Sequence, residues 1–96
     1  MKKRTSTNYH TLRTHKRRDE LRKWFNETFM NNISCIKCGN NNPIVIDFHH
    51  RDSSNKDGEV KRMVRKLFSK EAISAEVTKC DTVCANCHRI IHAESN

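Results

Sequence analysis

Two closely spaced cysteine pairs constrain this chain more than any other feature of its sequence. Cys35 and Cys38 form the first C-x2-C pair, and Cys84 and Cys87 form the second. A C-x2-C turn lets both thiolates face one ion at about 2.3 Å, so two such turns complete a tetrahedral zinc site. The alternatives are buried free thiols or a redox pair. We predict a structural zinc that joins the beginning of the folded region to its C-terminal end.

The number of cysteines argues against a disulfide framework. There are five, an odd number, and the chain has neither a signal peptide nor an apolar run long enough to span a membrane. A reducing cytoplasm with thiolates that hold a metal is the better interpretation. Cys80 belongs to neither pair, and we expect it to be a buried thiol that packs like a small apolar residue.

The composition explains why such a chain would need a metal. Of its 96 residues, 34% are hydrophobic and 31% are charged. A domain this small buries a lower share of its surface than a large one, so its apolar core contributes little stability alone. Zinc binding would add to the free energy of folding, because the site does not exist in the unfolded chain.

The charge balance indicates a polyanionic partner. Nineteen Lys and Arg residues against eleven Asp and Glu residues give a formal net charge of +8. Nucleic acid leads the candidates, although an anionic membrane surface or simple solubility would also account for the charge. Phosphate contacts by such residues give affinity that falls with salt and carries little sequence information. The candidate DNA-binding residues are Arg17, Arg18, Arg22, Lys23, Arg62 and Arg65.

The N-terminal part divides into an arm and a helix. Residues 1–15 are basic and polar and are expected to form a disordered arm, followed by a single domain over residues 16–96. Apolar side chains recur at helical spacing over residues 16–30, which predicts an amphipathic helix with basic residues opposite. The positions on its apolar face are Leu21, Trp24, Phe25, Thr28 and Phe29.

Two short strands are expected in the remainder of the chain. The β-branched run over residues 44–48 follows Pro43 and predicts a strand that delivers His49 and His50 at its end. Residues 78–83 could pair with this strand. Together with the helices, these strands indicate a small α+β domain.

Three further helices are predicted after the first strand. Apolar residues keep helical spacing over residues 60–67. Ser69 is a suitable N-cap for a helix over residues 70–77. A last helix is expected to begin just after Cys84.

Four of the six histidines lie in two short segments of the chain. His88 and His92 are four residues apart on a predicted helix, so both rings project from one face and can share a metal ion. His49 and His50 are adjacent on a strand and point in different directions, so one can bind the metal while the other faces a substrate. This division suits phosphodiester hydrolysis, in which a metal neutralises phosphate charge and a neutral histidine deprotonates water. The alternative is that His88 or His92 completes the zinc shell or caps the helix.

Three segments together resemble the cysteine-containing HNH endonucleases of phages and bacteria. They are the first cysteine pair, residues 46–52 (Ile-Asp-Phe-His-His-Arg-Asp) and residues 79–92, and the resemblance covers residues 35–93. It implies a ββα-metal (His-Me finger) core with a structural zinc held by four cysteines, in the cytoplasm of a bacterium or a phage-infected host cell. It also implies nicking or double-strand cleavage of DNA with weak sequence specificity, supported by Mg²⁺, Mn²⁺, Ni²⁺ or Zn²⁺.

The resemblance implies a role for each histidine. His50 matches the general base, and His49, His88 and His92 match ligands of the catalytic divalent metal. Lys79 occupies the position where the family usually has an asparagine that helps to orient the base, so the residue that orients His50 is left unassigned.

Two residues have open roles, and two other functions compete with the nuclease. Asp47 either orders a metal-bound histidine or is a solvated strand residue. Arg89 either contacts a phosphate oxygen in the catalytic site or is a solvated helix residue. The competing functions are a catalytically silent, zinc-bound DNA-binding module, which Lys79 favours, and an accessory protein of a phage DNA-packaging machine. No membrane partner is expected, and the sequence leaves the oligomeric state open, a monomer included.

Overall fold

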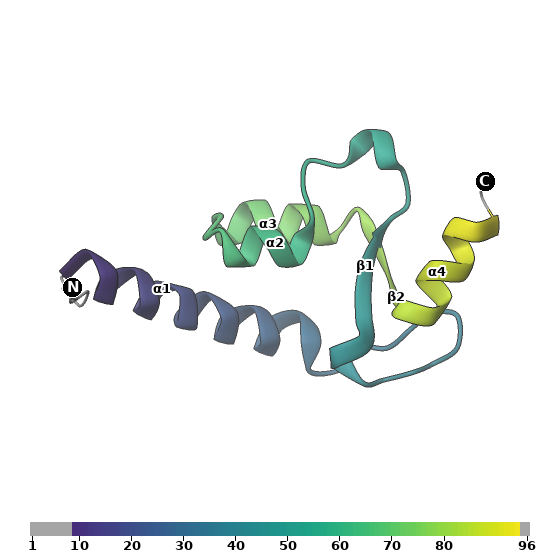
Figure 1. The fold of residues 1–96 in the computed structure, drawn as a ribbon, viewed down its shortest axis with the longest axis horizontal. Coiled ribbons are helices and arrows are strands. Elements are labelled where there is room, and N and C mark those ends of the chain that lie inside the picture. Colours follow the sequence, from purple (N-terminus) through teal and green to yellow (C-terminus); the bar gives the residue numbers. More distant parts are fainter. Residues whose placement is uncertain (1–8, 95–96) are drawn as a thin grey trace, which may run out of the picture.

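The structure, a computed structural model, describes residues 9–94 and is a small α+β fold (Figure 1). In chain order its elements are α1 (Tyr9–Phe25), β1 (Ile46–His50), α2 (Val60–Arg65), α3 (Lys70–Val77), β2 (Cys80–Cys84) and α4 (Ala85–Glu94). The two strands form an antiparallel sheet. In Figure 1, α4 lies to the right of this sheet, and α1, α2 and α3 lie to its left. Among the described residues, no helix has the length and apolar character needed to cross a membrane.

Helix α1 begins earlier than the sequence analysis predicted. Residues 9–15 were expected to belong to a disordered arm, but the helix starts at Tyr9, and the rest of that arm lies outside the described residues. The segment contains neither glycine nor proline, so nothing in it interrupts the helix. After Phe25 the helix continues as a π-helical turn over Asn26–Met30.

Four of the five positions predicted for the apolar face of the first helix pack against the core, and the fifth, Thr28, is exposed. Leu21 and Phe25 are buried, and Trp24 and Phe29 pack against the core from its edge. The ring centroids of Phe25 and Phe48 are 5.8 Å apart, which joins α1 to β1.

Strand β1 is shifted by two residues from its predicted position. Pro43–Val45 form a 3₁₀ turn. The Asn42 side chain caps this turn by accepting a hydrogen bond from the Ile44 N–H, and proline is a favoured residue at the first position of a helix. The strand therefore starts at Ile46, and His49 and His50 are its last two residues rather than residues beyond it. They pair with Asp81 and Cys80 of β2, respectively. Successive side chains of a strand point to opposite faces, so the two histidines diverge.

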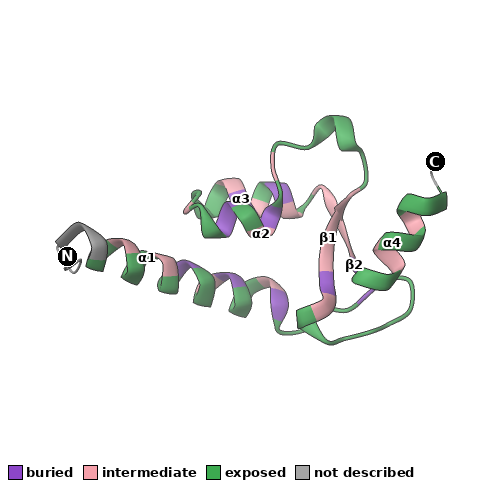
Figure 2. Ribbon diagram, in the orientation of Figure 1, coloured by how far each residue is buried: buried purple, intermediate pink, exposed green. Residues whose placement is uncertain are grey.

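Helices α2 and α3 connect the two strands. The Ser69 side chain accepts a hydrogen bond from the Ala72 N–H and begins α3, which confirms the predicted cap. Apolar side chains of both helices, together with those of α1 and the sheet, form the core (Figure 2). The fully or nearly fully buried members are Ile46, Val60, Ile73 and Val83.

Helix α4 begins directly after Cys84, as predicted, and is only loosely packed. None of its residues is buried (Figure 2). Cys87 and Ile91 are partly buried and pack against the edge of the core. A helix that buries so little apolar surface gains little stability from packing. Apolar packing alone therefore does little to hold α4 on the sheet, and contacts of its cysteine and histidine side chains are needed to hold it there.

Candidate metal centres

The four paired cysteines converge at one end of the sheet. Cys35 and Cys38 come from the turn that follows α1, Cys84 ends β2, and Cys87 lies in the first turn of α4. Their sulfur atoms all lie within 4.8 Å of one another, and the Sγ atoms of Cys38 and Cys84 are 3.7 Å apart. A tetrahedral zinc with bonds of about 2.3 Å separates its sulfurs by about 3.8 Å. The quartet could therefore hold a metal ion such as zinc.

The backbone around the cysteines prepares their sulfurs for a cation. Gly39 has a φ of 80°, and its N–H donates to the Cys35 carbonyl at 2.9 Å, which closes the turn. Burial by itself would raise the pKa of the Cys35 thiol, but backbone hydrogen bonds from Cys84, Cys38 and Lys37 lower it to about 6. The same turn therefore favours a thiolate, the form that binds a metal.

The remaining sulfurs need a cation before all four can be charged. The neighbouring Cys84 side chain, together with burial, raises the pKa of Cys87 to about 12. Because a metal binds thiolates, its binding would release the proton that Cys87 holds at neutral pH. Binding should therefore be stronger at higher pH.

Three imidazoles form a second cluster with no member in common with the first. His49 comes from β1, and His88 and His92 come from α4. The Nε2 atoms of His88 and His92 are 3.0 Å apart, and the ring centroids of His49 and His88 are 4.9 Å apart. Metal–nitrogen bonds of about 2.0–2.1 Å separate adjacent ligand atoms by about 3.0–3.4 Å, depending on the coordination geometry. These three residues could hold a metal ion.

Asp47 lies behind this cluster. Its Oδ2 atom is 3.0 Å from His88 Nδ1, so the carboxylate accepts the Nδ1–H and leaves His88 Nε2 with a lone pair directed at the cluster. The sequence left the role of Asp47 open, and this contact is the one expected of a residue that orders a metal-bound histidine. Burial first, and then the charges of His88 and His92, lower the pKa of His49. A lowered pKa keeps His49 neutral, which is the form that binds a metal.

His50 points away from the histidine cluster and into the interior. Its Nε2 atom lies 2.6 Å from Oε2 of Glu76, and the two side chains are only 7% and 2% exposed. Glu76 was not predicted as a site residue, because only the apolar residues of its short helix were expected to face inward. One signal could have found it. Glu76 is three residues after the buried Ile73, so the helical spacing places it on the inward face of α3.

Glu76 is surrounded by donors. It accepts hydrogen bonds from the N–H of Asp57 at 2.9 Å and from Lys79 Nζ at 3.0 Å, in addition to its contact with His50. Burial by itself would raise the pKa of this carboxyl, but the hydrogen bonds from Asp57, His50 and Lys79 are chief among those that lower it to about 2. Glu76 is therefore a carboxylate at neutral pH.

Lys79 contacts Glu76 rather than His50. Its Nζ atom also donates to the Asn55 carbonyl at 3.0 Å and to Asp57 Oδ2 at 2.8 Å. Hydrogen bonds to the carboxylates of Asp57 and Glu76 raise the pKa of Lys79. The lysine thus ties the end of α3 to the loop that follows β1.

Two other residues singled out from the sequence lie near the sites. Arg89 is exposed on α4 and has no partner within the part of the chain that the structure describes. Cys80 is half-buried, and burial raises the pKa of its thiol to about 11. The Cys80 thiol is therefore protonated at neutral pH and unreactive, in line with the expected packing role.

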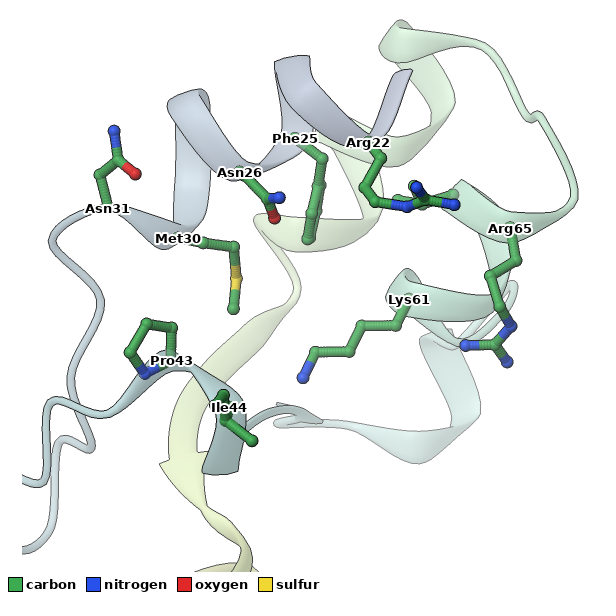
Figure 3. A pocket seen from close by; sticks show the side chains of 10 residues that line it. Arg22, Phe25, Asn26, Met30, Asn31, Pro43, Ile44, Lys61 and Arg65 are labelled. Carbon is green, nitrogen blue, oxygen red and sulfur yellow. The ribbon is translucent and has the colours of Figure 1, made fainter. Parts of the chain in front are cut away.

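A basic cavity of about 570 Å³ lies between α1, α2 and the turn before β1 (Figure 3). Arg22 enters it from α1, and Lys61 and Arg65 enter it from α2, over an apolar floor that includes Phe25. Its lining, taken from the described residues, contains no acidic side chain. Lys61 also lines a smaller cavity beside His88, whose lining includes the acidic Asp47 and Glu59, and its Nζ donates to the Ile46 carbonyl at 2.6 Å.

The remaining candidate DNA-binding residues lie outside this cavity. Arg17, Lys23 and Arg62 are exposed, and Arg18 is half-buried. Lys23 is 4.0 Å from Glu27, a weak contact between exposed groups. The structure therefore brings two of the six predicted residues, Arg22 and Arg65, to one concave surface.

The chain matches no protein-family model, no curated protein and no solved structure. The functional assignment therefore depends on the two clusters, the buried pair of His50 and Glu76, and the basic cavity.

Proposed function

We propose that this protein is a metal-dependent endonuclease of the HNH type, which hydrolyses phosphodiester bonds of DNA. The observation that carries the proposal is the convergence of His49, His88 and His92 beside a separate cysteine quartet. Closed sets of four cysteines are typical of structural metal sites, whereas three protein ligands are typical of catalytic ones. In this proposal β1, β2 and α4 form a ββα-metal core, and the order and antiparallel register of these elements are consistent with it.

The histidine cluster would provide the electrostatic part of catalysis. A divalent ion held there would supply positive charge that stabilises the scissile phosphate and the leaving 3′ oxygen. His49, His88 and His92 bind that ion, and Asp47 fixes the ring of His88 through its Nδ1–H. The donor set of three imidazoles suits Ni²⁺ or Zn²⁺, whereas Mg²⁺ and Mn²⁺ prefer oxygen ligands.

His50 is the general base of the proposal. Its Nε2 is engaged by Glu76, so Nδ1 is the nitrogen that accepts a proton from the attacking water. A neutral imidazole serves this purpose near physiological pH.

The basic cavity would hold the DNA backbone. Arg22 and Arg65 are exposed cations at the rim of a concave surface, and Lys61, which donates to the Ile46 carbonyl, adds a third cation to its lining. Arg89 is an exposed cation next to His88 on α4 and would contact a phosphate near the site of cleavage. None of these contacts reads a base, so cleavage should depend weakly on sequence.

Cleavage of supercoiled plasmid tests the proposal. The zinc-loaded protein is incubated with plasmid and Mg²⁺, Mn²⁺, Ni²⁺ or added Zn²⁺, in parallel with the variants His50→Ala and His15→Ala. His15 is an exposed histidine of α1, so His15→Ala is the matched control. We expect the wild type and the control to convert plasmid to the nicked form, and His50→Ala to nick about 100-fold or more slowly, with a residual rate that can still be measured. The assignment fails if the wild type does not nick with any of the four metals, or if His50→Ala nicks as fast as the wild type.

A second candidate is a DNA-binding module without catalysis. The burial of His50, whose side chain is 7% exposed, favours it, because a general base must reach water. This candidate would be supported if the protein binds DNA in a salt-dependent way, measured separately, and does not nick plasmid in the assay above.

A further inference from the structure

The contact between His50 and Glu76 identifies a role that neither the sequence nor the proposed mechanism assigned. We propose that Glu76 is the positioning residue of His50: it fixes the ring so that Nε2 carries the proton and Nδ1 is left to accept one. This inference rests on the proposed nuclease function. It concerns what orients the base, not whether a base is needed.

The geometry of the pair determines the tautomer of His50. The Nε2 and Oε2 atoms are 2.6 Å apart, a short, charge-assisted hydrogen bond. An ionised carboxylate has no proton to donate, so the hydrogen must belong to Nε2 of His50. In the neutral ring the lone pair is then on Nδ1. Both side chains are almost completely buried, so the ring has little freedom to rotate away.

Glu76 is itself held firmly enough to act in this way. Its Oε2 atom accepts the N–H of Asp57 at 2.9 Å and lies 3.4 Å from the N–H of Gly58. Its Oε1 atom accepts Lys79 Nζ at 3.0 Å. Burying a carboxylate costs free energy unless hydrogen-bond donors of the protein replace the water molecules that it loses. These hydrogen bonds determine where each oxygen lies, and hence where the ring of His50 can lie.

Lys79 acts on His50 indirectly, through Glu76. Its ammonium group joins Oε1 of Glu76 to Asp57 Oδ2, so it orders the carboxylate from the side opposite His50. Lys79 therefore supports the base through Glu76. This gives a physical function to a position where the HNH resemblance leads one to expect asparagine.

The first test is kinetic and uses the full-length, zinc-loaded protein. Glu76→Gln keeps the shape of the side chain but removes its charge, and Glu71→Gln, at an exposed position of the same helix, is the matched control. We expect Glu76→Gln to lower the kcat of plasmid nicking by about 100-fold, the lower end of what general-base catalysis contributes, with KM for DNA unchanged. In a His50→Ala background the same substitution should have no further effect, because the residue through which Glu76 acts is gone.

The kinetic result would overturn the proposal in either of two ways. The first is that Glu76→Gln raises KM and leaves kcat unchanged. The second is that Glu76→Gln lowers activity by the same factor with and without His50, which indicates a general effect on the fold. Zinc content and Tm, measured for every variant, show whether a loss of activity comes from unfolding.

The second test does not depend on activity. The ¹⁵N shifts of the histidine rings, recorded at about pH 8, well above the usual histidine pKa of about 6.5, report which nitrogen of each ring carries the proton. We expect His50 to be the Nε2–H tautomer in the wild type and to lose this preference in Glu76→Ala. An Nδ1–H tautomer in the wild type would overturn the positioning role even if the protein nicks DNA. If the protein does not nick but the tautomer is as expected, the proposed function fails and the geometric part of the inference stands.

Discussion

Asp47 Oδ2 lies 3.0 Å from His88 Nδ1, and this contact joins the first strand to the last helix across the candidate catalytic centre. Residues 47 and 88 are far apart in the chain, and antiparallel pairing of β1 with β2 brings α4 to the edge of β1. The carboxylate fixes the proton on Nδ1 of His88, so Nε2 is available to a metal. A partner of this kind affects metal affinity more than it affects folding.

Replacing Asp47 should therefore weaken metal binding. We expect Asp47→Ala to lower the affinity of the histidine cluster for Ni²⁺ by about 10- to 100-fold, the usual effect of losing such a partner. Calorimetric titration of the zinc-loaded protein measures this affinity. Asp19→Ala is the control, because Asp19 is exposed on α1. Equal affinities for wild type and Asp47→Ala would show that the contact does not serve metal binding.

Removal of zinc should release α4. None of the residues of α4 is buried, so its docking relies on Cys87 and the other three cysteines more than on apolar contacts. We expect about one tightly bound zinc per chain, and we expect chelation to abolish hydrogen-exchange protection in α4 before protection in α3 is lost. Cys84→Ser should have the same effect. Cys80→Ala should retain the zinc, because Cys80 is outside the quartet, and protection of α4 that survives chelation would contradict this view.

Local signals predicted most of the fold. The helix over residues 70–77 and its cap at Ser69 were predicted at the positions where they occur, because capping and periodicity depend on neighbours within one turn. The start of β1 was misplaced because Ile44 and Val45, the first two β-branched residues of the run, belong to the 3₁₀ turn that begins at Pro43 and not to the strand. The start of α1 was misplaced because polar residues without an apolar period were equated with disorder.

The candidate site was only partly predictable for a different reason. Both metal clusters were inferred from the sequence, since C-x2-C turns and histidines four residues apart carry their geometry with them. The contact of His50 with Glu76 joins residues that are 26 positions apart in the chain, one at the end of β1 and the other on α3, and only the folded chain brings them together. No spacing rule relates a strand histidine to a helix glutamate across an intervening loop and helix. In the sequence, Lys79 stood out only because the HNH resemblance implies asparagine at this position. Its contact with Glu76 depends on the fold, as do its hydrogen bonds to Asn55 and Asp57.

Acid should destabilise the protein partly through Glu76. The pKa of this carboxyl is about 2 in the folded protein, against a usual value of 4.5. A lowered folded-state pKa means that the unfolded chain binds the proton more readily. The stabilisation by Glu76 is therefore complete above about pH 4.5 and is lost as pH falls from there toward about 2.

Comparing denaturant unfolding of the wild type with that of Glu76→Gln isolates this contribution. Protonation of the cysteine thiolates and histidines also destabilises the protein in acid, but it does so in both proteins. We expect the difference between their free energies of unfolding to be constant near neutral pH and to shrink between about pH 4.5 and pH 2. A difference that stays constant over this range would show that Glu76 is not stabilised as a carboxylate in the folded protein.

DNA binding should depend on the cations of the basic cavity. Arg22 and Arg65 line the cavity, are exposed, and lie on different helices, so they are placed to contact separate phosphates. In a plot of log K, the logarithm of the association constant, against the logarithm of the salt concentration, each phosphate contact to duplex DNA makes the negative slope steeper by about 0.9. We expect the double variant Arg22→Ala/Arg65→Ala to bind DNA more weakly and to lose up to about 1.8 from this slope.

The loss should be the same for duplexes of unrelated sequence, because phosphate contacts carry no sequence information. Fluorescence anisotropy at several salt concentrations measures both the affinity and the slope. The zinc-loaded protein is used in EDTA-free buffer without added divalent metal, so that the structural zinc is kept and cleavage is not supported. Lys37→Ala is the control, since Lys37 is an exposed cation of the cysteine turn and lies outside the cavity. If the double variant keeps the wild-type slope while Lys37→Ala reduces it, the DNA backbone contacts the cysteine turn rather than the cavity, and the proposed role of the basic cavity is wrong.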